Sequence, residues 1–519
     1  MRTLASDEFA GRAPGTEGEE KTVAYLAGEL RKIGLEPAGP GGSWFQEVPL
    51  VGITGTPGTL LFQRGETEQR LAPGDDFVAW TKRAVPSVEL AGSELVFAGY
   101  GVAAPELGWD DFKGVDLRGK TMVVLVGDPP VPDPADPTRL DPATFGGEAM
   151  TYYGRWTYKY DAGAERGAAG VLIVHETREA GYDFSIVQGK LGEQLDLQTP
   201  DGNAGRPAVE GWLTRERAAG LFALAGHDFE ALKRSAARRD FRPVPLGVTA
   251  SLAISNRLRP FVSRNVAGRL PGSDPARRDE HVVVTAHWDH FGIGPAIDGE
   301  TVRHGALDNA SGVASLLELA RAFAAAGRRP ARSLLFLAVT AEEQGLLGSE
   351  LYVRAPLVPL AKTAAVLNFE MMNVYGRAED LVLYGLGSSE LDDYVAAAAT
   401  RQEREVVGDP AAEQGWFYRS DHFPFARRGV PAIWATGGER LTGKPPGQAR
   451  RLREEFIAVR YHKPRDVVTA DWDLTGVADD LGIYFDVAAA VADAPRMPEW
   501  RPGAEFRAAR EAMLGRAPD

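Results

Sequence analysis

The sequence predicts an α/β protein built on a mixed, mainly parallel sheet flanked by helices. Residues 281–287 (HVVVTAH) and 332–340 (RSLLFLAVT) are largely apolar without alternation, as strands covered on both faces are. Helical patterns separate these strands from each other and from apolar runs at 364–372 and 430–436. Alternating strands and helices are typical of a sheet with helices on both faces. Side chains that can bind metal follow several of these strand ends.

The composition describes an acidic, cysteine-free globular chain. Its 519 residues, with 44% hydrophobic and 25% charged, allow two or three domains with a large core. The formal net charge of −14 disfavours nucleic acid as a partner, because it leaves no excess positive charge to neutralise phosphates. Because cysteine is absent, any metal must be held by His, Asp or Glu. No apolar run approaches the ~20 residues that span a bilayer.

Residues 1–88 are expected to form the N-terminal part of the main domain. An amphipathic helix is predicted over residues 17–34, where Val23, Leu26 and Leu30 share one face and Gly34 ends the helix. A stretch rich in Gly and Pro and several short strand-like pieces follow.

Residues 89–247 predict an inserted, smaller, β-rich α+β domain. Strand-like runs occur at 94–102, 120–128 and 170–176, and a helical pattern precedes the last of them. The segment 128–142 is rich in Pro and Asp and is expected to be an exposed loop. This region contains no cluster of potential metal ligands, so its isolated histidines are expected to be structural.

Residues 248–494 are expected to form most of the main domain. A helix is predicted over 309–326, with Val313, Leu316 and Phe323 facing inward and Gly327 ending it. A second helix follows at 345–353, and the remaining strands are predicted at 364–372, 380–386 and 430–436. The charged, Pro-containing tail 495–519 is expected to be peripheral.

Five potential metal ligands, with a further carboxylate beside one of them, follow strand ends or lie in connecting loops of this domain: His287, Asp308, Glu342, Glu343, Glu370 and His462. In open α/β sheets the active crevice lies outside the carboxyl ends of the strands. Taken singly, Asp308 could cap the following helix, and Glu342 and Glu343 could favour a helix start. Their coincidence at one edge makes a metal site the better interpretation.

Two imidazoles and three carboxylates can hold two zinc ions, which lie ~3.5–4 Å apart in two-metal hydrolases. A neighbouring free carboxylate can then act as a general base, and the same ligands could accept cobalt or manganese. Asp289 is placed to hold the imidazole of His287 in one tautomer. The pattern therefore predicts a metal-dependent hydrolase.

The motifs AHWDH (286–290), GALDNASG (305–312), AEEQGLLGS (341–349) and YHKPRD (461–466) occur in this order. Together they resemble the co-catalytic zinc aminopeptidases of the aminopeptidase Y type, a group that includes glutamate carboxypeptidase, glutaminyl cyclase and the transferrin receptor. The resemblance covers residues 1–34 and 248–492 and implies the zinc exopeptidase fold. Residues 89–247 resemble the protease-associated domain, most closely in GAERGAAGVLIVHE.

The resemblance also implies a role for each ligand. Asp308 would bridge two zinc ions, Glu343 and His462 would complete one site, and His287 and Glu370 the other. The family more often has Asp where this chain has Glu370, and the extra methylene could shift that metal or weaken its binding. His290 is not expected to be a ligand.

Three further residues receive implied catalytic roles. Glu342 would be the general base that deprotonates a metal-bridging water and later protonates the leaving amine. Asp289 would orient His287. Tyr461 would donate a hydrogen bond to the oxyanion, with simple packing as the alternative.

The implied function is a zinc-dependent exopeptidase, foremost an aminopeptidase for peptides with a free N-terminus. A carboxypeptidase for acidic dipeptides, to which the basic loop 438–456 would be suited, and a glutaminyl cyclase remain alternatives, as does a non-catalytic receptor-like protein. The group implies a secreted or periplasmic protein, although Met1 leads directly into a polar stretch without a signal peptide. The oligomeric state is left open.

Overall fold

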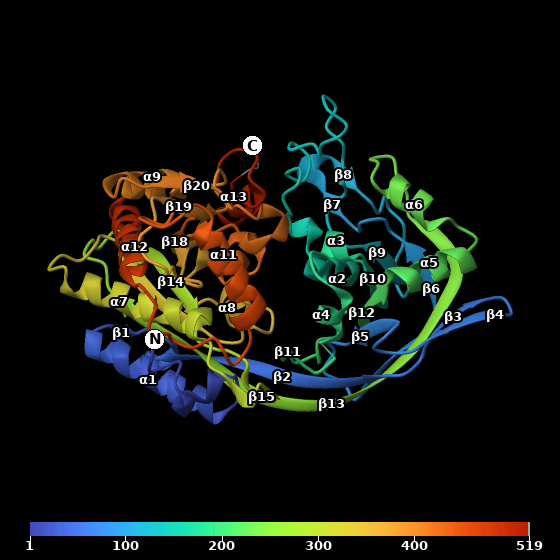
Figure 1. Cartoon of the computed structure of the whole chain (residues 1–519), viewed down its shortest axis with the longest axis horizontal. Helices are drawn as coiled ribbons and strands as arrows, with labels where there is room; N and C mark the ends of the chain where they lie inside the picture. The colour runs from blue at the N-terminus through green and yellow to red at the C-terminus, as the bar shows by residue number, and fades with distance from the viewer. Residues whose placement is uncertain (190, 517–519) are drawn as a thin grey trace. The chain divides into compact units, whose positions relative to one another are not determined.

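The computed structural model describes residues 1–189 and 191–516, and the chain forms two compact units (Figure 1). The first comprises Met1–Val48, Val262–Pro410 and Arg419–Asp519, and the second Pro49–Phe261 and Ala411–Tyr418. These boundaries differ from those expected at 88/89 and 247/248. Residues 49–88 join the second unit because they form strands that pair with strands further along that unit.

The sheet of the first unit is mixed and mainly parallel, as predicted. Strand pairing gives the order β1 (Glu36–Pro37), β13 (Val244–Leu270), β17 (Ser333–Val339), β14 (His281–His287), β18 (Thr363–Asn368), β21 (Ala432–Gly437), β19 (Asp380–Tyr384) and β20 (Glu405–Val407). β14 is parallel to both of its neighbours, whereas β13 and β19 run antiparallel to β17 and β21. Every residue of β14, β17 and β18 is buried, which explains their unbroken apolar runs.

Helices flank this sheet. The main core joins the sheet to α1 (Glu17–Ile33), α7 (Ser311–Ala325), α9 (Leu391–Arg401) and α12 (Thr475–Asp493), and Phe323 of α7 stacks on Phe485 of α12 at 4.4 Å. The shorter helices α8 (Leu347–Arg354) and α10 (His422–Arg427) pack on each other through Tyr352 and Phe425. α11 (Gln448–Glu455) precedes the YHKPRD motif.

The predicted helices of this unit form close to their expected limits. α1 ends where Gly34 adopts a left-handed conformation (φ 91°) and donates its backbone N–H to carbonyls of the last turn. Val23, Leu26 and Leu30 are buried, as the apolar periodicity predicted. α7 likewise buries Val313, Leu316 and Phe323, although it begins two residues later than expected.

The tail after residue 494 was expected to be peripheral, and this expectation was wrong. Trp500 and Arg510 are buried, and the indole of Trp500 donates a hydrogen bond to the carbonyl of Gly429 at 2.9 Å. The segment carries α13 (Arg507–Met513). Its charged composition concealed these few large side chains, which anchor it to the first unit.

The second unit is β-rich, with three of its helices against the strands. β6 (Ser87–Phe97), β9 (Thr121–Leu125), β10 (Gly170–His175) and β12 (Val209–Thr214) pair in parallel, and β5 (Phe77–Trp80) closes that edge antiparallel. β13 pairs with β6 and with β3 (Leu60–Arg64), which pairs with β4 (Thr67–Leu71). β2 (Phe45–Pro57) pairs with β11 (Glu193–Leu197). The three helices packed against these strands are α2 (Trp156–Glu165), α5 (Arg215–Leu224) and α6 (Phe229–Ala236).

Among residues 1–189 and 191–516, no helix combines the length and the apolar character that crossing a membrane requires.

Candidate metal centre

Parallel pairing brings the metal-ligand candidates to one edge of the first unit's sheet. His287, the last residue of β14, lies opposite Val339 of β17, and Thr285 lies opposite Asn368 of β18. Glu342 and Glu343 follow β17 directly, and Glu370 lies two residues after β18. These side chains therefore converge beyond the carboxyl ends of three adjacent strands.

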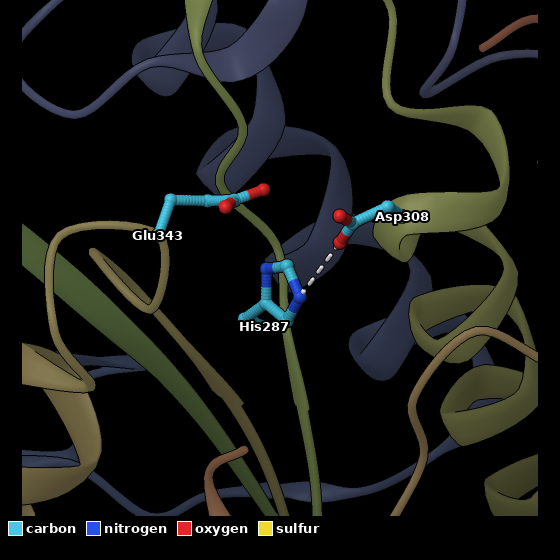
Figure 2. Close-up of side chains that lie close together, drawn as sticks. All are labelled: His287, Asp308 and Glu343. Atoms are coloured by element: carbon cyan, nitrogen blue, oxygen red, sulfur yellow. Dashed lines mark ion pairs between the residues drawn. The ribbon is translucent and has the colours of Figure 1, made fainter. Parts of the chain in front are cut away.

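Asp308 lies between two imidazoles. Its Oδ1 is 3.2 Å from Nε2 of His287 (Figure 2), and its Oδ2 is 3.3 Å from Nε2 of His462. Asp308 does not cap the following helix, because Ala310 occupies the N-cap position of α7 and no side chain there accepts a capping hydrogen bond. Asp466 accepts the backbone N–H of Asp308 at 3.1 Å, which fixes the peptide from which the carboxylate projects.

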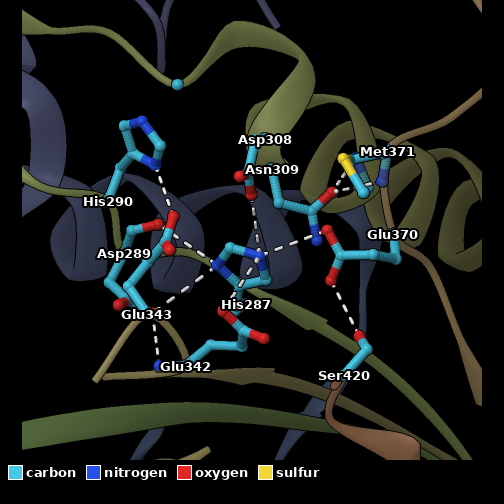
Figure 3. A network of polar contacts seen from close by, with 12 residues as sticks. His287, Asp289, His290, Asp308, Asn309, Glu342, Glu343, Glu370, Met371 and Ser420 are labelled. Carbon is cyan, nitrogen blue, oxygen red and sulfur yellow. Dashed lines mark hydrogen bonds and ion pairs between the residues drawn. The ribbon is translucent and has the colours of Figure 1, made fainter. Parts of the chain in front are cut away.

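His287 turns its two nitrogens toward different groups (Figure 3). Nε2 is 3.3 Å from Oε1 of Glu370 and 3.8 Å from Oε2 of Glu342. Nδ1 is 3.2 Å from the backbone carbonyl of Asp289 and 3.7 Å from its carboxylate. A proton on Nδ1, donated to that carbonyl, leaves the Nε2 lone pair free for a metal. The Asp289 carboxylate instead accepts the backbone N–H of Glu342 at 3.1 Å.

Glu343 contacts a second pair of imidazoles. Its Oε2 is 3.2 Å from Nε2 of His462, and its Oε1 is 2.6 Å from Nδ1 of His290. Two groups of three side chains bring their potential ligand atoms within 4.8 Å of one another, and His287 belongs to both. The first group adds Asp308 and Glu343, and the second adds Glu342 and Glu370. His290, which was not expected to be a ligand, thus holds a carboxylate of the first group.

Several polar side chains hold the carboxylates in place. Ser420 donates to Oε2 of Glu370 at 2.8 Å and accepts from the amide of Asn368 at 2.7 Å. The amide of Asn309 donates to the carbonyl of Phe369 at 2.9 Å. The sequence interpretation gave no role to Asn309, Asn368 or Asp466, although Asn309 and Asp466 stand inside the motifs that carried the resemblance.

The electrostatics of the site call for a cation. In the described part of the chain, the carboxylates of Asp308, Glu342, Glu343 and Glu370 form ion pairs with imidazoles but with no Lys or Arg. Burial raises the pKa of Glu342 well above its usual range, despite the nearby imidazole of His287. Four carboxylates that are buried or nearly so and whose ion pairs are with imidazoles fit one or more divalent ions of the zinc type.

The side chain of His462 is 34% exposed, although its Nε2, which faces Asp308, is buried. The ring centroid of Tyr461 lies 3.6 Å from that of His462, and the ring centroid of Phe291 lies 4.5 Å from it. Burial and the nearby carboxylates raise the pKa of Tyr461 well above its ordinary value, so its hydroxyl stays protonated and able to donate.

Comparison with known proteins gives similarities to the segment that carries this site. Residues 265–485 match the model of peptidase family M28. The chain is 32% identical over 195 residues to leupeptin-inactivating enzyme 1 of Streptomyces exfoliatus, covering 36% of this chain and 38% of that protein. It is 30% identical over 233 residues to a probable leucine aminopeptidase 2 of Aspergillus fumigatus, covering 43% of each.

An aminopeptidase of Bacillus subtilis is 27% identical over 208 residues, covering 40% of each chain. The matches therefore span about two fifths of these curated relatives. Among solved structures, an aminopeptidase from Aneurinibacillus sp. strain AM-1 is similar over 95% of this chain and 92% of that one, at 19% identity and a TM-score of 0.48. All six candidate side chains lie inside residues 265–485, the segment that matches the model of peptidase family M28.

Proposed function

We propose that the protein is a zinc-dependent aminopeptidase that removes the N-terminal residue from peptides with a free α-amine. One observation carries the proposal: the two oxygens of Asp308 face two different imidazoles, at 3.2 and 3.3 Å. A carboxylate in this position suits a bridge between two cations. The match of residues 265–485 to peptidase family M28 and the relatives described as aminopeptidases support the same activity.

Two zinc ions per chain would be held by the side chains that converge on Asp308. His287 and Glu370 would hold one ion, and Glu343 and His462 the other, with Asp308 shared. Bound zinc would polarise the scissile carbonyl and make a water molecule easier to deprotonate. His290 would orient Glu343 through their 2.6 Å contact, and Ser420 would orient Glu370.

Glu342 is the proposed general base. Its carboxylate lies 3.8 Å from His287 and is 12% exposed, so it borders the same space without being fixed by a short contact. Its backbone N–H is held by Asp289, which fixes the point from which the side chain extends. Glu342 takes the proton from the attacking water and passes it to the leaving nitrogen, and Tyr461 donates to the developing oxyanion.

The basic loop 438–456 argues against a carboxypeptidase for acidic dipeptides. Arg450 and Arg453 lie 2.9 and 3.5 Å from the carboxylate of Glu439, and Arg440 lies 2.7 Å from that of Glu405. Two carboxylates thus partly compensate the charges of these three arginines, which leaves them less suited to binding a substrate carboxylate. A glutaminyl cyclase, which typically needs one zinc, is disfavoured by a donor set that suits two.

The second unit is proposed to be a protease-associated domain, on its resemblance and on its β-rich architecture with helices α2, α5 and α6. A secreted or periplasmic location is proposed from the resemblance alone.

The test is hydrolysis of a panel of aminoacyl p-nitroanilides, their N-acetylated counterparts and blocked acidic dipeptides. Chelator-stripped protein would be assayed with and without added zinc. We expect zinc-dependent cleavage of the free-amine substrates only. Cleavage of the acidic dipeptides in place of the anilides would indicate a carboxypeptidase, and no turnover with zinc bound would contradict the proposed activity.

A further inference from the structure

The first fifteen residues lie outside the segment that matches the peptidase family, yet they reach the loops that carry the metal-ligand candidates. Arg12 is 1% exposed, although no carboxylate forms an ion pair with it among the described residues. A fully buried guanidinium is costly unless hydrogen bonds satisfy its donors. The partners of Arg12 therefore indicate what it does.

Arg12 donates hydrogen bonds to four backbone carbonyls. Its Nε donates to Trp288 at 2.8 Å, within the loop that carries His287, Asp289 and His290. Its terminal nitrogens donate to His304 at 2.7 Å and to Gly305 at 2.8 Å, in the loop that leads to Asp308. The fourth bond, to Leu4 at 2.6 Å, closes the N-terminal segment on itself. One planar side chain thus ties together the two loops that carry His287 and Asp308. The imidazole and the carboxylate of these two residues meet at 3.2 Å (Figure 3).

The backbone around Arg12 is shaped for this insertion. Ala10, Gly11 and Arg12 have φ values of 47°, 69° and 53°, a left-handed run that side-chain-bearing residues rarely adopt. A Cβ on Gly11 would lie 2.4 Å from the carbonyl oxygen of Arg303 and 2.6 Å from that of Gly292. The turn is therefore pressed against the hairpin formed by β15 (Gly292–Ile297) and β16 (Glu300–Arg303), which connects the two loops.

Two further contacts join the same segments. The imidazole Nε2 of His304 lies 2.8 Å from the carboxylate of Asp7, and the His304 side chain is 11% exposed. The backbone N–H of His290 points to the carbonyl of Arg12 at 3.4 Å. The contacts run from the N-terminal segment to both sides of the candidate site, and Arg12 contributes the largest number of them.

We propose that Arg12 is a positioning residue that sets the separation of His287 and Asp308, so that the N-terminal segment forms part of the metal site. This inference rests on the proposed zinc site, but Arg12 itself touches neither metal nor substrate. Its loss should let the loop after β14 and the loop before α7 move independently. The affinity for metal should then fall, because outer partners of metal ligands typically contribute about 10–100-fold.

A matched control exists in Arg332, which is also 1% exposed. It donates to the carbonyl of Val491 at 2.9 Å and to Glu280 at 2.6 Å. It immediately precedes β17, at the opposite end of the strand from Glu342 and Glu343. Replacing Arg332 should therefore remove a buried guanidinium that donates to a backbone carbonyl, in this case together with its ion pair to Glu280, without moving the candidate ligands.

The experiment compares R12K and R12M with R332K and R332M. Zinc affinity would be measured by competition with a chromophoric chelator and by the zinc dependence of the thermal midpoint, which reports affinity even in a destabilised variant. The d–d absorption of cobalt-loaded protein would report the ligand geometry. We expect zinc affinity to fall ~10–100-fold in the Arg12 variants, with an altered cobalt spectrum, and to stay within about twofold in the Arg332 variants.

Each other outcome decides against a different claim. Wild-type protein that binds no zinc would contradict the proposed function itself. Wild-type affinity and spectrum in folded Arg12 variants would overturn the positioning role. Equal losses of affinity in both pairs would also overturn it, because they would show a general effect of stability. Failure of R12K to fold at saturating zinc, while R332K folds, would make Arg12 a folding residue and likewise overturn the proposal.

Discussion

Glu342 and Glu343 are adjacent in the chain, but their contacts predict that replacing each with Gln affects a different property, turnover in one case and zinc affinity in the other. Glu343 lies 2.6 Å from His290 and 3.2 Å from His462, as a ligand held on both oxygens would. Among the described residues, the carboxylate of Glu342 forms one ion-pair contact, a long one of 3.8 Å to His287. Replacing Glu with Gln keeps the side-chain volume while removing the charge and the ability to accept a proton.

E342Q should therefore keep its zinc and lose turnover. A general base contributes about 10²–10⁴-fold to rate, which corresponds to about 2.7–5.5 kcal/mol at roughly 1.36 kcal/mol for each factor of ten. E343Q should instead lose zinc affinity by ~100-fold or more, since partners of ligands alone contribute about 10–100-fold. E342Q should not destabilise the metal-free protein, because burial among other carboxylates raises the pKa of Glu342 and so disfavours its charge. The same does not hold for E343Q, since the pKa of Glu343 is lowered to about 2 in the presence of His462 and His290.

The assay measures zinc content after dialysis at controlled free zinc, together with kcat on an aminoacyl p-nitroanilide at saturating zinc. Near-normal kcat in E342Q would remove Glu342 from the role of base. Loss of zinc from E342Q and retention in E343Q would reverse the two roles and refute the reasoning from contact distances.

Two other residues give independent predictions. S420A removes the 2.8 Å hydrogen bond to Glu370, and chelator competition should show zinc affinity lower by about tenfold; unchanged affinity would mean that Glu370 needs no support. Burial lowers the pKa of His281 from 6.5 to about 4, so the unfolded chain binds a proton between these values that the folded chain does not. The free energy of unfolding should therefore be highest above pH 6.5 and should fall by up to about 3 kcal/mol as the pH drops to 4. In urea unfolding of the metal-free proteins, the free energy of unfolding of H281Q should vary less with pH between 4 and 6.5 than that of the wild type. The same pH dependence in both proteins would contradict the lowered pKa of His281.

The strands and helices that carry the site could be predicted because their patterns are local. HVVVTAH and RSLLFLAVT are buried throughout, as unbroken apolar runs predict, and Gly34 ends α1 where a left-handed residue is needed. The convergence of His287, Glu342 and Glu370 followed from the rule that parallel strands share a carboxyl edge.

Other features could not be predicted because they depend on long-range packing. Nothing in the sequence around Arg12 indicates that its donors meet carbonyls 276 to 293 residues away. No sequence pattern around His290 indicates whether its imidazole contacts a buried carboxylate or lies at the surface. β13 was missed as one continuous strand of 27 residues, because its alternating polar positions and Pro260 interrupt any local pattern.

The central claim is that Asp308 bridges two metal ions, and the most direct measurement is the zinc stoichiometry of the stripped protein. Zinc would be added stepwise to wild-type protein and to D308N, with bound metal determined by mass spectrometry and cleavage of an aminoacyl p-nitroanilide followed in parallel. If Asp308 bridges two ions, we expect two zinc ions per wild-type chain and loss of both tight sites in D308N. A single zinc in the wild type, or two tightly bound ions in D308N, would contradict it.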